Sequence, residues 1–337
     1  MADLPVHQGT SDVDASADTI QSLRLAIEQG LSDEMQRRGP ALMYDPIRYV
    51  LDGGGKRARP VLLSLVAQAY GASEEEAMSP ALAVEVFHNF TLVHDDIMDR
   101  SDTRRGRPAV HVKWDEGTAI LAGDLMLGLS YELLTKPETV NVRSVLGIYN
   151  RMVEQLCIGQ RLDTHFETEK EVSVDDYLGM IDGKTAALLS ACFEIGAVVG
   201  GAPDSDVLAL ADAGRFTGRA FQIQDDVLDL TADSDDWGKP VGGDLVNGKR
   251  TFLTLRAIER AEESEKRWFE RILDGGISQD EVPEARDRME RLGVIDDAKE
   301  AVETYTEYAF DAISVLPEGT FADAAIAMLS RLQSRSY

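Results

Sequence analysis

The segment Phe90–Arg105 reads FTLVHDDIMDRSDTRR, an apolar run that ends in three carboxylates and a pair of arginines. At 3.6 residues per turn, Asp95 and Asp99 lie one above the other on a helix, with Asp96 on the adjoining face. Like charges at this spacing repel by roughly 0.2–0.5 kcal/mol per pair, so a helix that carries them on a buried side needs a cation there. The segment therefore predicts a cation-binding helix end.

The same pattern occurs again in FQIQDDVLDL, residues 221–230, where Asp225, Asp226 and Asp229 follow an apolar helical run. Mg²⁺ is usually held by one or two carboxylates together with substrate phosphate oxygens and water. Two such helix ends facing each other across an apolar cleft would hold a diphosphate through bridging metal ions. A solvated acidic face is the alternative, but the run before the first triplet is too apolar for a free surface.

Composition narrows the classes of protein to consider. The chain has 337 residues, a net charge of −26 and 44% hydrophobic residues, which is enough for a sizeable core. The acidic balance argues against nucleic acid and anionic membranes as partners, because both require basic patches. The longest apolar stretch, Ala186–Gly200, is shorter than the roughly 20 residues of a membrane span, and the N-terminus lacks signal-peptide features. We therefore expect a cytoplasmic protein without a membrane span.

Lysine is scarce, with 9 Lys and 25 Arg against 60 Asp and Glu. Such a surface suits concentrated salt, where screening weakens its self-repulsion, so we hypothesise a halophilic source; an ordinary acidic cytosolic protein is the alternative. Cys157 and Cys192 lie in apolar helical patterns, which predicts buried thiols in a reducing compartment.

The helical period dominates the chain. Residues 1–17 are polar and aperiodic, which predicts a mobile tail. Later apolar positions recur at helical spacing, and long helices are expected at 74–99, 118–135, 139–166, 174–200 and 207–230. No convincing strand alternation and no solenoid-length repeat is present. The sequence therefore predicts an all-α fold, with a single domain over residues 18–337.

Basic residues gather in the loop GGGKRARP, residues 53–60, where three glycines allow close approach of the backbone to a ligand. Lys56, Arg57 and Arg59 supply three cationic donors within four residues, so the loop predicts anion binding. The spacing of a P-loop is absent. His88, about two turns before Asp95, is either a core histidine or a ligand contact.

Three further basic segments follow. They are SDTRRGRP at 101–108, GKT at 183–185, and the Gly-, Asp- and Pro-rich stretch 231–251 with Lys239 and Lys249. Beside the first triplet, Arg104 and Arg105 suit bidentate capture of a diphosphate, although surface ion pairing is the simpler interpretation. The composition of 231–251 predicts a lid over the cleft.

From about Ile47 to Arg256 the chain resembles the trans-prenyltransferases, also called polyprenyl synthetases. The motifs that carry the resemblance stand in family order: GGGKRARP, LVHDDIMDRSDTRRGRP, GKT, FQIQDDVLDL and GKPVGGDLVNGKRT. The resemblance implies an isoprenoid-synthase helical bundle around a central cavity, usually assembled as a homodimer.

The resemblance also implies a role for each motif residue. The implied Mg²⁺ ligands are Asp95, Asp96, Asp99, Asp225, Asp226 and Asp229. The implied contacts of the allylic diphosphate are Arg104, Lys184, Thr185, Gln222, Lys239 and Lys249, and those of isopentenyl diphosphate are Lys56, Arg59, His88 and Arg105. Catalysis is expected to depend most on Asp95, Asp99, Arg104, Lys184 and Asp225.

The implied reaction is a Mg²⁺-dependent, head-to-tail condensation of isopentenyl diphosphate with allylic diphosphates of C5 to C15. Metal ions and cations stabilise the charge on the leaving diphosphate, so the allylic carbon can ionise in a site closed to water. The isopentenyl double bond then attacks, and a proton is lost. No protein nucleophile is required, and the chain offers no obvious Ser/His/Asp or Cys/His set.

Product length should depend on the side chains beneath the first triplet. Phe90 lies five residues before Asp95, Phe87 lies a turn beyond it, and Thr91 is small. This arrangement resembles the archaeal type of geranylgeranyl diphosphate synthase and predicts mainly a C20 product, unless both phenylalanines are ordinary core residues.

Several alternatives stay open. A farnesyl or longer-chain (C25) synthase of the same family is poorly separated by sequence. A non-catalytic partner subunit would be expected to lose aspartates, whereas both triplets are whole here. A terpene cyclase would not explain two complete diphosphate motifs.

Overall fold

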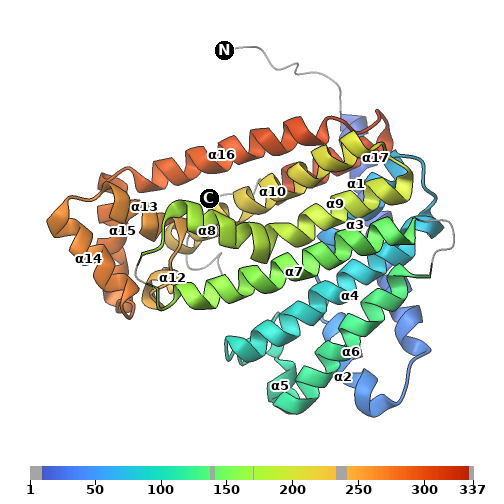
Figure 1. Cartoon of the computed structure of the whole chain (residues 1–337), viewed down its shortest axis with the longest axis horizontal. Helices are drawn as coiled ribbons and strands as arrows, with labels where there is room; N and C mark the ends of the chain where they lie inside the picture. The colour runs from blue at the N-terminus through green and yellow to red at the C-terminus, as the bar shows by residue number, and fades with distance from the viewer. Residues whose placement is uncertain (1–9, 137–140, 170, 233–240, 334–337) are drawn as a thin grey trace. The chain divides into compact units, whose positions relative to one another are not determined.

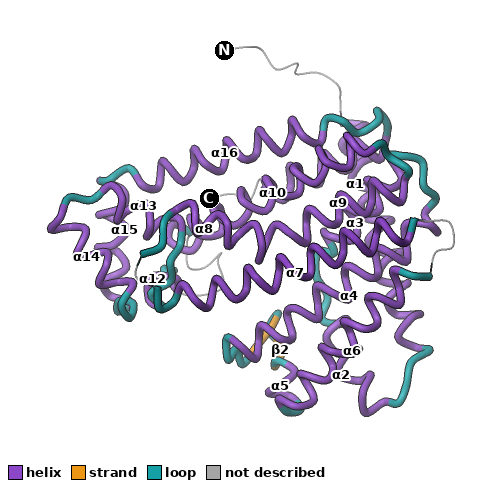
Figure 2. The backbone as a smooth tube through the Cα atoms, in the orientation of Figure 1, coloured by secondary structure: helices purple, strands orange, loops and turns teal. Residues whose placement is uncertain are grey.

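The computed structural model describes residues 10–136, 141–169, 171–232 and 241–333. Almost all of this backbone is helical, as Figures 1 and 2 show, and the prediction of an all-α fold is confirmed. The first half contains α1 Thr10–Gln36, α2 Ala41–Leu51, α3 Ala58–Ala69, α4 Glu74–Met98, α5 Val110–Lys113, α6 Glu116–Leu134 and α7 Val142–Phe166. The second half contains α8 Val174–Ile181, the π-helix η1 Asp182–Ala186, α9 Ala187–Gly200, α10 Asp204–Thr231, α12 Gly243–Val246, α13 Phe252–Arg260, α14 Glu263–Leu273, the 3₁₀-helix η2 Gln279–Glu281, α15 Val282–Arg291, α16 Val294–Ile313 and α17 Thr320–Gln333.

Residue contacts divide the chain into two compact units. Unit 1 comprises Met1–Tyr149, Cys192–Leu208 and Val315–Met328, and unit 2 comprises Asn150–Ala191, Ala209–Ser314 and Leu329–Tyr337. The expectation of a single domain over residues 18–337 stays a prediction.

In unit 1, α4 packs along both α3 and α6 and carries the first aspartate triplet at its C-terminal end. Its N-terminus is fixed by a capping box, in which Ser73 and Glu76 satisfy each other's backbone N–H groups. Its middle is completely buried, from Ala81 through Phe87. A rigid, buried helix therefore positions the carboxylates of the triplet.

A short hairpin follows α4, drawn in orange in Figure 2. Strand β1, Thr103–Arg104, pairs antiparallel with β2, Arg107–Pro108. Both residues of the connecting turn have positive φ, +51° at Arg105 and +72° at Gly106, as the favoured two-residue hairpin turn requires. The sequence did not predict these strands, because two residues are too few for an alternating pattern.

In unit 2, one buried apolar cluster joins α8, α10 and the helices from α13 to α16. Its largest members include Tyr177, Phe252, Phe269 and Met289. Helix α8 continues directly into η1, so the GKT motif lies at the point where the helix widens. The cluster fixes the buried side of α10, which carries the second triplet.

Three sequence expectations need comment. Helix α1 begins at Thr10, so residues 10–17 are helical and the expected tail is too long; the polar residues there hid the helical period. Cys192 is buried, as predicted, but Cys157 is exposed, so that part of the thiol prediction is wrong. By length and hydropathy alone, Glu116–Leu134 and Val174–Gly200 could cross a membrane. In their most apolar 18-residue windows, 44% and 61% of the window is buried, and core helices of soluble proteins also pass this test.

Candidate active site

The carboxylates of the first triplet differ in their surroundings. Asp96 is buried, and its Oδ1 accepts hydrogen bonds from Arg104 Nε at 2.9 Å and Nη2 at 2.5 Å. Asp95 is half-buried and Asp99 is exposed. Asp96 therefore holds Arg104 beside the helix end, while the other two carboxylates lie nearer to solvent.

The loop GGGKRARP is anchored by Arg57. Its guanidinium is buried, donating from Nη1 to Glu85 Oε1 at 2.6 Å and from Nη2 to the Leu51 carbonyl at 2.6 Å. Asn89 Nδ2 also donates to Glu85, at 2.9 Å. The three cations of the loop are thus unequal: Arg57 is a buried anchor, whereas Lys56 is exposed.

His88 lies within a group of cations. Arg59 Nη1 lies 3.2 Å from His88 Nε2, and because a guanidinium can only donate, the imidazole nitrogen accepts. Burial, followed by the positive charges of Arg59 and Arg105, lowers the pKa of His88 well below its ordinary value. His88 is therefore a neutral acceptor in a strongly positive field, which an anionic ligand would offset.

Arg105 lies against the glycine loop. Its Nη1 donates to the Gly54 carbonyl, and its guanidinium would lie 3.2–3.3 Å from a Cβ placed on Gly55. Gly55 has φ +142°, which other residues rarely adopt. A shallow cleft adjoins this arginine and is lined in part by Asn89 and Asp96.

The second triplet shows the same division into buried and accessible carboxylates. Asp226 is buried and accepts hydrogen bonds from Tyr177 Oη at 2.6 Å, the Phe252 N–H at 3.1 Å and Gln222 Nε2 at 3.2 Å. Burial raises the pKa of Asp226 to about 7. Asp229 is also buried and accepts from the Asp244 N–H at 2.9 Å, whereas Asp225 is half-buried.

The GKT motif joins this network. Thr185 Oγ1 donates to Gln222 Oε1 at 3.2 Å, and Lys184 Nζ contacts Asp163 Oδ2. Lys249 lies farther along the chain, with its Nζ 3.5 Å from Asp244 Oδ1. The structure therefore brings Thr185, Gln222 and the second triplet together; Lys239 lies outside the described residues.

The donor set fits Mg²⁺ only if the substrate shares in coordination. Among the described residues, no group of three or more His, Cys, Asp and Glu side chains is placed to hold a metal ion. Carboxylate oxygens are nevertheless the ligands that Mg²⁺ prefers, and it commonly completes its shell with substrate phosphate oxygens and water. Asp95, Asp99 and Asp225, the more accessible aspartates, suit such a shared site.

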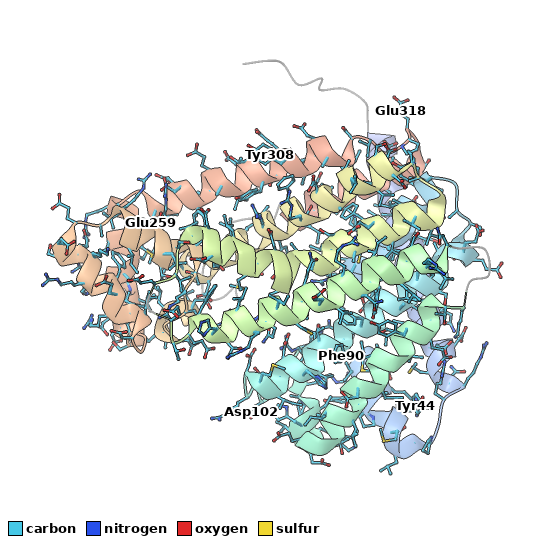
Figure 3. All side chains as sticks on the ribbon, viewed as in Figure 1. Tyr44, Phe90, Asp102, Glu259, Tyr308 and Glu318 are labelled. Atoms are coloured by element: carbon cyan, nitrogen blue, oxygen red, sulfur yellow. The ribbon has the colours of Figure 1, made fainter. Side chains whose placement is uncertain are left out.

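The predicted chain-length residues lie on α4, where Figure 3 labels Phe90 part-way along the helix and Asp102 beyond its end. Phe87 is 1% exposed, and its ring centroid is 5.3 Å from those of both Phe90 and Tyr149. Phe90 is half-buried, and Thr91 Oγ1 donates to the His88 carbonyl at 2.8 Å. The two phenylalanines form one aromatic layer with Tyr149 behind it.

Sequence reasoning missed the residues that support this site from a distance along the chain. Tyr177 bonds Asp226 from another helix, and Glu85 lies 28 residues from Arg57. Neither belongs to a local motif. A buried acidic residue in the apolar stretch of α4 was the available signal for Glu85, because a buried charge requires a partner.

Comparison with known proteins identifies relatives along nearly the whole chain. The family model for polyprenyl synthetases matches residues 40–289. The chain is 38% identical to a geranylgeranyl diphosphate synthase of Methanosarcina mazei, covering 95% of this chain and 98% of the relative. It is 37% identical to a geranylfarnesyl diphosphate synthase of Natronomonas pharaonis, covering 96% and 99%. The crystal structure of a geranylgeranyl pyrophosphate synthetase from Pyrococcus horikoshii superposes with a TM-score of 0.89 at 35% identity, covering 96% and 99%.

Proposed function

Because the chain belongs to the polyprenyl synthetase family, we propose that it condenses isopentenyl diphosphate with allylic diphosphates of C5 to C15 and releases mainly geranylgeranyl diphosphate. The observation that carries this proposal is the cationic group around neutral His88. Within it, Arg59 Nε is buried without a hydrogen-bond partner among the described residues. A buried donor of this kind calls for an acceptor, and a diphosphate oxygen would supply one.

At the isopentenyl end, we assign diphosphate binding to Lys56, Arg59, His88 and Arg105. Arg59 and Arg105 have pKa values lowered by burial, which an anionic ligand would reverse. Neutral His88 accepts from Arg59 through Nε2, so its proton lies on Nδ1. The histidine thereby orients the guanidinium and keeps one donor, but adds no further positive charge.

At the allylic end, we assign diphosphate contacts to Arg104, Lys184, Thr185, Gln222, Lys239 and Lys249. Asp95, Asp99 and Asp225 would hold Mg²⁺, which supplies positive charge that stabilises the leaving diphosphate. Asp96, Asp226 and Asp229 are proposed as further Mg²⁺ ligands; each also accepts hydrogen bonds from the protein, through which it would orient Arg104 or α10.

The chain's own residues contribute placement and charge to the proposed reaction. Lys184 and Arg104 oppose the negative charge that develops as the allylic C–O bond breaks. The isopentenyl double bond then forms the new C–C bond, and the released diphosphate takes the proton that is lost. No side chain has to act as a nucleophile.

The test is incubation with isopentenyl diphosphate and each allylic primer in turn, in high salt, followed by product sizing. Condensation with C5, C10 and C15 primers, abolished by EDTA and by omission of the primer, would support the proposal. Failure to consume isopentenyl diphosphate with any primer, in a folded sample with Mg²⁺, would refute it. Such a failure would instead favour a terpene cyclase or a non-catalytic subunit.

Product length is the finer part of the proposal. The aromatic layer of Phe87 and Phe90 would form the floor of the cavity and stop elongation at C20, with C15 as intermediate or co-product. A C25 product is the second candidate, favoured by the similarity to a geranylfarnesyl diphosphate synthase. A farnesyl diphosphate synthase is a further alternative, and sizing of the product distinguishes all three.

We also propose a cytoplasmic homodimer from a halophilic source. Helix α6 exposes two neighbouring apolar side chains, Ile120 (41%) and Leu121 (54%), which a second copy would cover. The net charge of −26 suits a salt-rich medium. Light scattering in molar KCl should give twice the chain mass, and a monomer would contradict the homodimer. Activity should fall on dilution into low salt, and full activity without salt would contradict the halophilic source.

A further inference from the structure

The π-helix η1 presents the two diphosphate contacts of the GKT motif. It runs from Asp182 to Ala186 and carries Lys184 and Thr185 in its widened turn. A π turn contains about one residue more than an α turn, and so changes the direction of the side chains that follow by about 100°. Such turns are rare, and their geometry needs support from the surrounding structure.

Glycines on two neighbouring helices allow close contact with η1. A Cβ on Gly159 of α7 would lie 2.2 Å from the Lys184 backbone nitrogen, and one on Gly218 of α10 would lie 2.4 Å from Ala186 Cβ. Both contacts are closer than side chains permit. They bring the backbones together, but they do not by themselves fix the turn's rotation.

Arg219, the residue after Gly218, forms a bidentate ion pair with Asp182, the first residue of the π turn. Its Nε donates to Asp182 Oδ1 at 2.7 Å and its Nη2 to Asp182 Oδ2 at 2.6 Å. Two parallel bonds between planar groups fix orientation as well as distance. The hydrogen bond with Asp182 is also the main cause that raises the pKa of Arg219.

The other side of Arg219 is also held in place. Its Nη1 donates to Tyr305 Oη at 3.3 Å, and its guanidinium carbon lies 5.3 Å from the centroid of the Tyr305 ring. The Tyr305 ring in turn stacks on Phe216, with an interplanar angle of 16°. The guanidinium of Arg219 thus links Tyr305 of α16 to Asp182 of the π turn.

We propose that Arg219 is a positioning residue: through Asp182 it maintains the π turn that aims Lys184 and Thr185 at the allylic diphosphate. This inference rests on the proposed function. Without the paired hydrogen bonds, the turn relaxes toward α geometry, and Lys184 and Thr185 rotate away. Thr185 would then also leave Gln222, to which it donates at 3.2 Å.

The experiment compares Arg219→Gln and the milder Arg219→Lys with wild type, measuring the two KM values and kcat separately. We expect the KM for farnesyl diphosphate to rise about tenfold in Arg219→Gln, within the roughly 100-fold that a misplacement by about 1 Å can cost, and to rise less in Arg219→Lys. The KM for isopentenyl diphosphate should change less than about twofold, because its contacts lie on other elements. Asp182→Asn should reproduce the effect, and the double variant should add little.

Arg256→Gln is the matched control, because Arg256 Nε pairs with Asp297 at 2.8 Å in the same unit and neither residue belongs to η1. Lys184→Ala is the positive control for a lost diphosphate contact. If Arg219→Gln and Arg219→Lys leave the farnesyl KM unchanged, raise both KM values equally, or act no differently from Arg256→Gln, the inference is wrong. If wild type itself condenses no primer, the proposed function has failed; a selective loss in the variants requires an active wild type.

Discussion

The buried pair of Arg57 and Glu85 offers a sharp test of how the anion-binding loop is held. Their side chains are 4% and 3% exposed, and Nη1 and Oε1 lie 2.6 Å apart. Glu85→Gln would remove the close carboxylate partner of the buried guanidinium and leave Glu28, whose Oε1 lies 4.0 Å from Arg57 Nε, as a weaker partner. Removal of one partner from a buried pair costs about 3–5 kcal/mol, which at roughly 2 °C per kcal/mol lowers Tm by about 6–10 °C.

The assay is thermal and denaturant unfolding in high salt, with two comparison variants. Arg57→Met combined with Glu85→Leu should recover much of the loss, because apolar replacement of both partners removes the buried charge. Asp212→Asn, which breaks the surface pair with Arg215 (53% and 41% exposed), should cost less than about 1 kcal/mol. A Glu85→Gln variant as stable as Asp212→Asn, or a double variant less stable than the single, would refute this account of the loop.

Three further predictions concern the product, the glycine loop and the thiols. Phe90→Ala should lengthen the main product beyond C20, as measured by chromatography; an unchanged distribution would remove this residue as the floor. Gly55→Ala should raise the KM for isopentenyl diphosphate roughly tenfold, because a Cβ at φ +142° is strained and lies 3.2 Å from the Arg105 guanidinium, whereas Gly128→Ala, with open space, should not. At pH 8 a thiol reagent should label Cys157 alone in the native protein and both cysteines in denaturant, since burial raises the pKa of Cys192 to about 12; rapid native labelling of Cys192 would contradict this.

The sequence was sufficient where the apolar helical period is long. Helix α4 was expected at 74–99 from that period and spans Glu74–Met98, and the structure adds a capping box of Ser73 and Glu76 at its start. Helix α10 was likewise expected at 207–230 and spans Asp204–Thr231. These two helices carry both aspartate triplets, so the framework of the candidate site could be predicted.

The sequence was insufficient where tertiary contacts determine the role of a residue or the local backbone geometry. Nothing in GGGKRARP distinguishes Arg57 from its neighbours, and only the buried carboxylate of Glu85 separates an anchor from a ligand. The π turn at Asp182–Ala186 was read as continuous helix, because one extra residue in an apolar run hardly disturbs its period. The different surroundings of the aspartates within each triplet also depend on tertiary contacts, since Asp226 accepts a hydrogen bond from Tyr177 on another helix.

The central claim is that both aspartate triplets hold Mg²⁺ on a single allylic diphosphate. The most direct measurement is a crystal structure of the chain with Mg²⁺ and a non-reactive thiolodiphosphate analogue of farnesyl diphosphate. We predict ions that bridge the analogue's diphosphate to Asp95 and Asp99 on one side and to Asp225 on the other. A diphosphate bound by one triplet alone, with the other beyond the reach of any shared ion, would contradict the account.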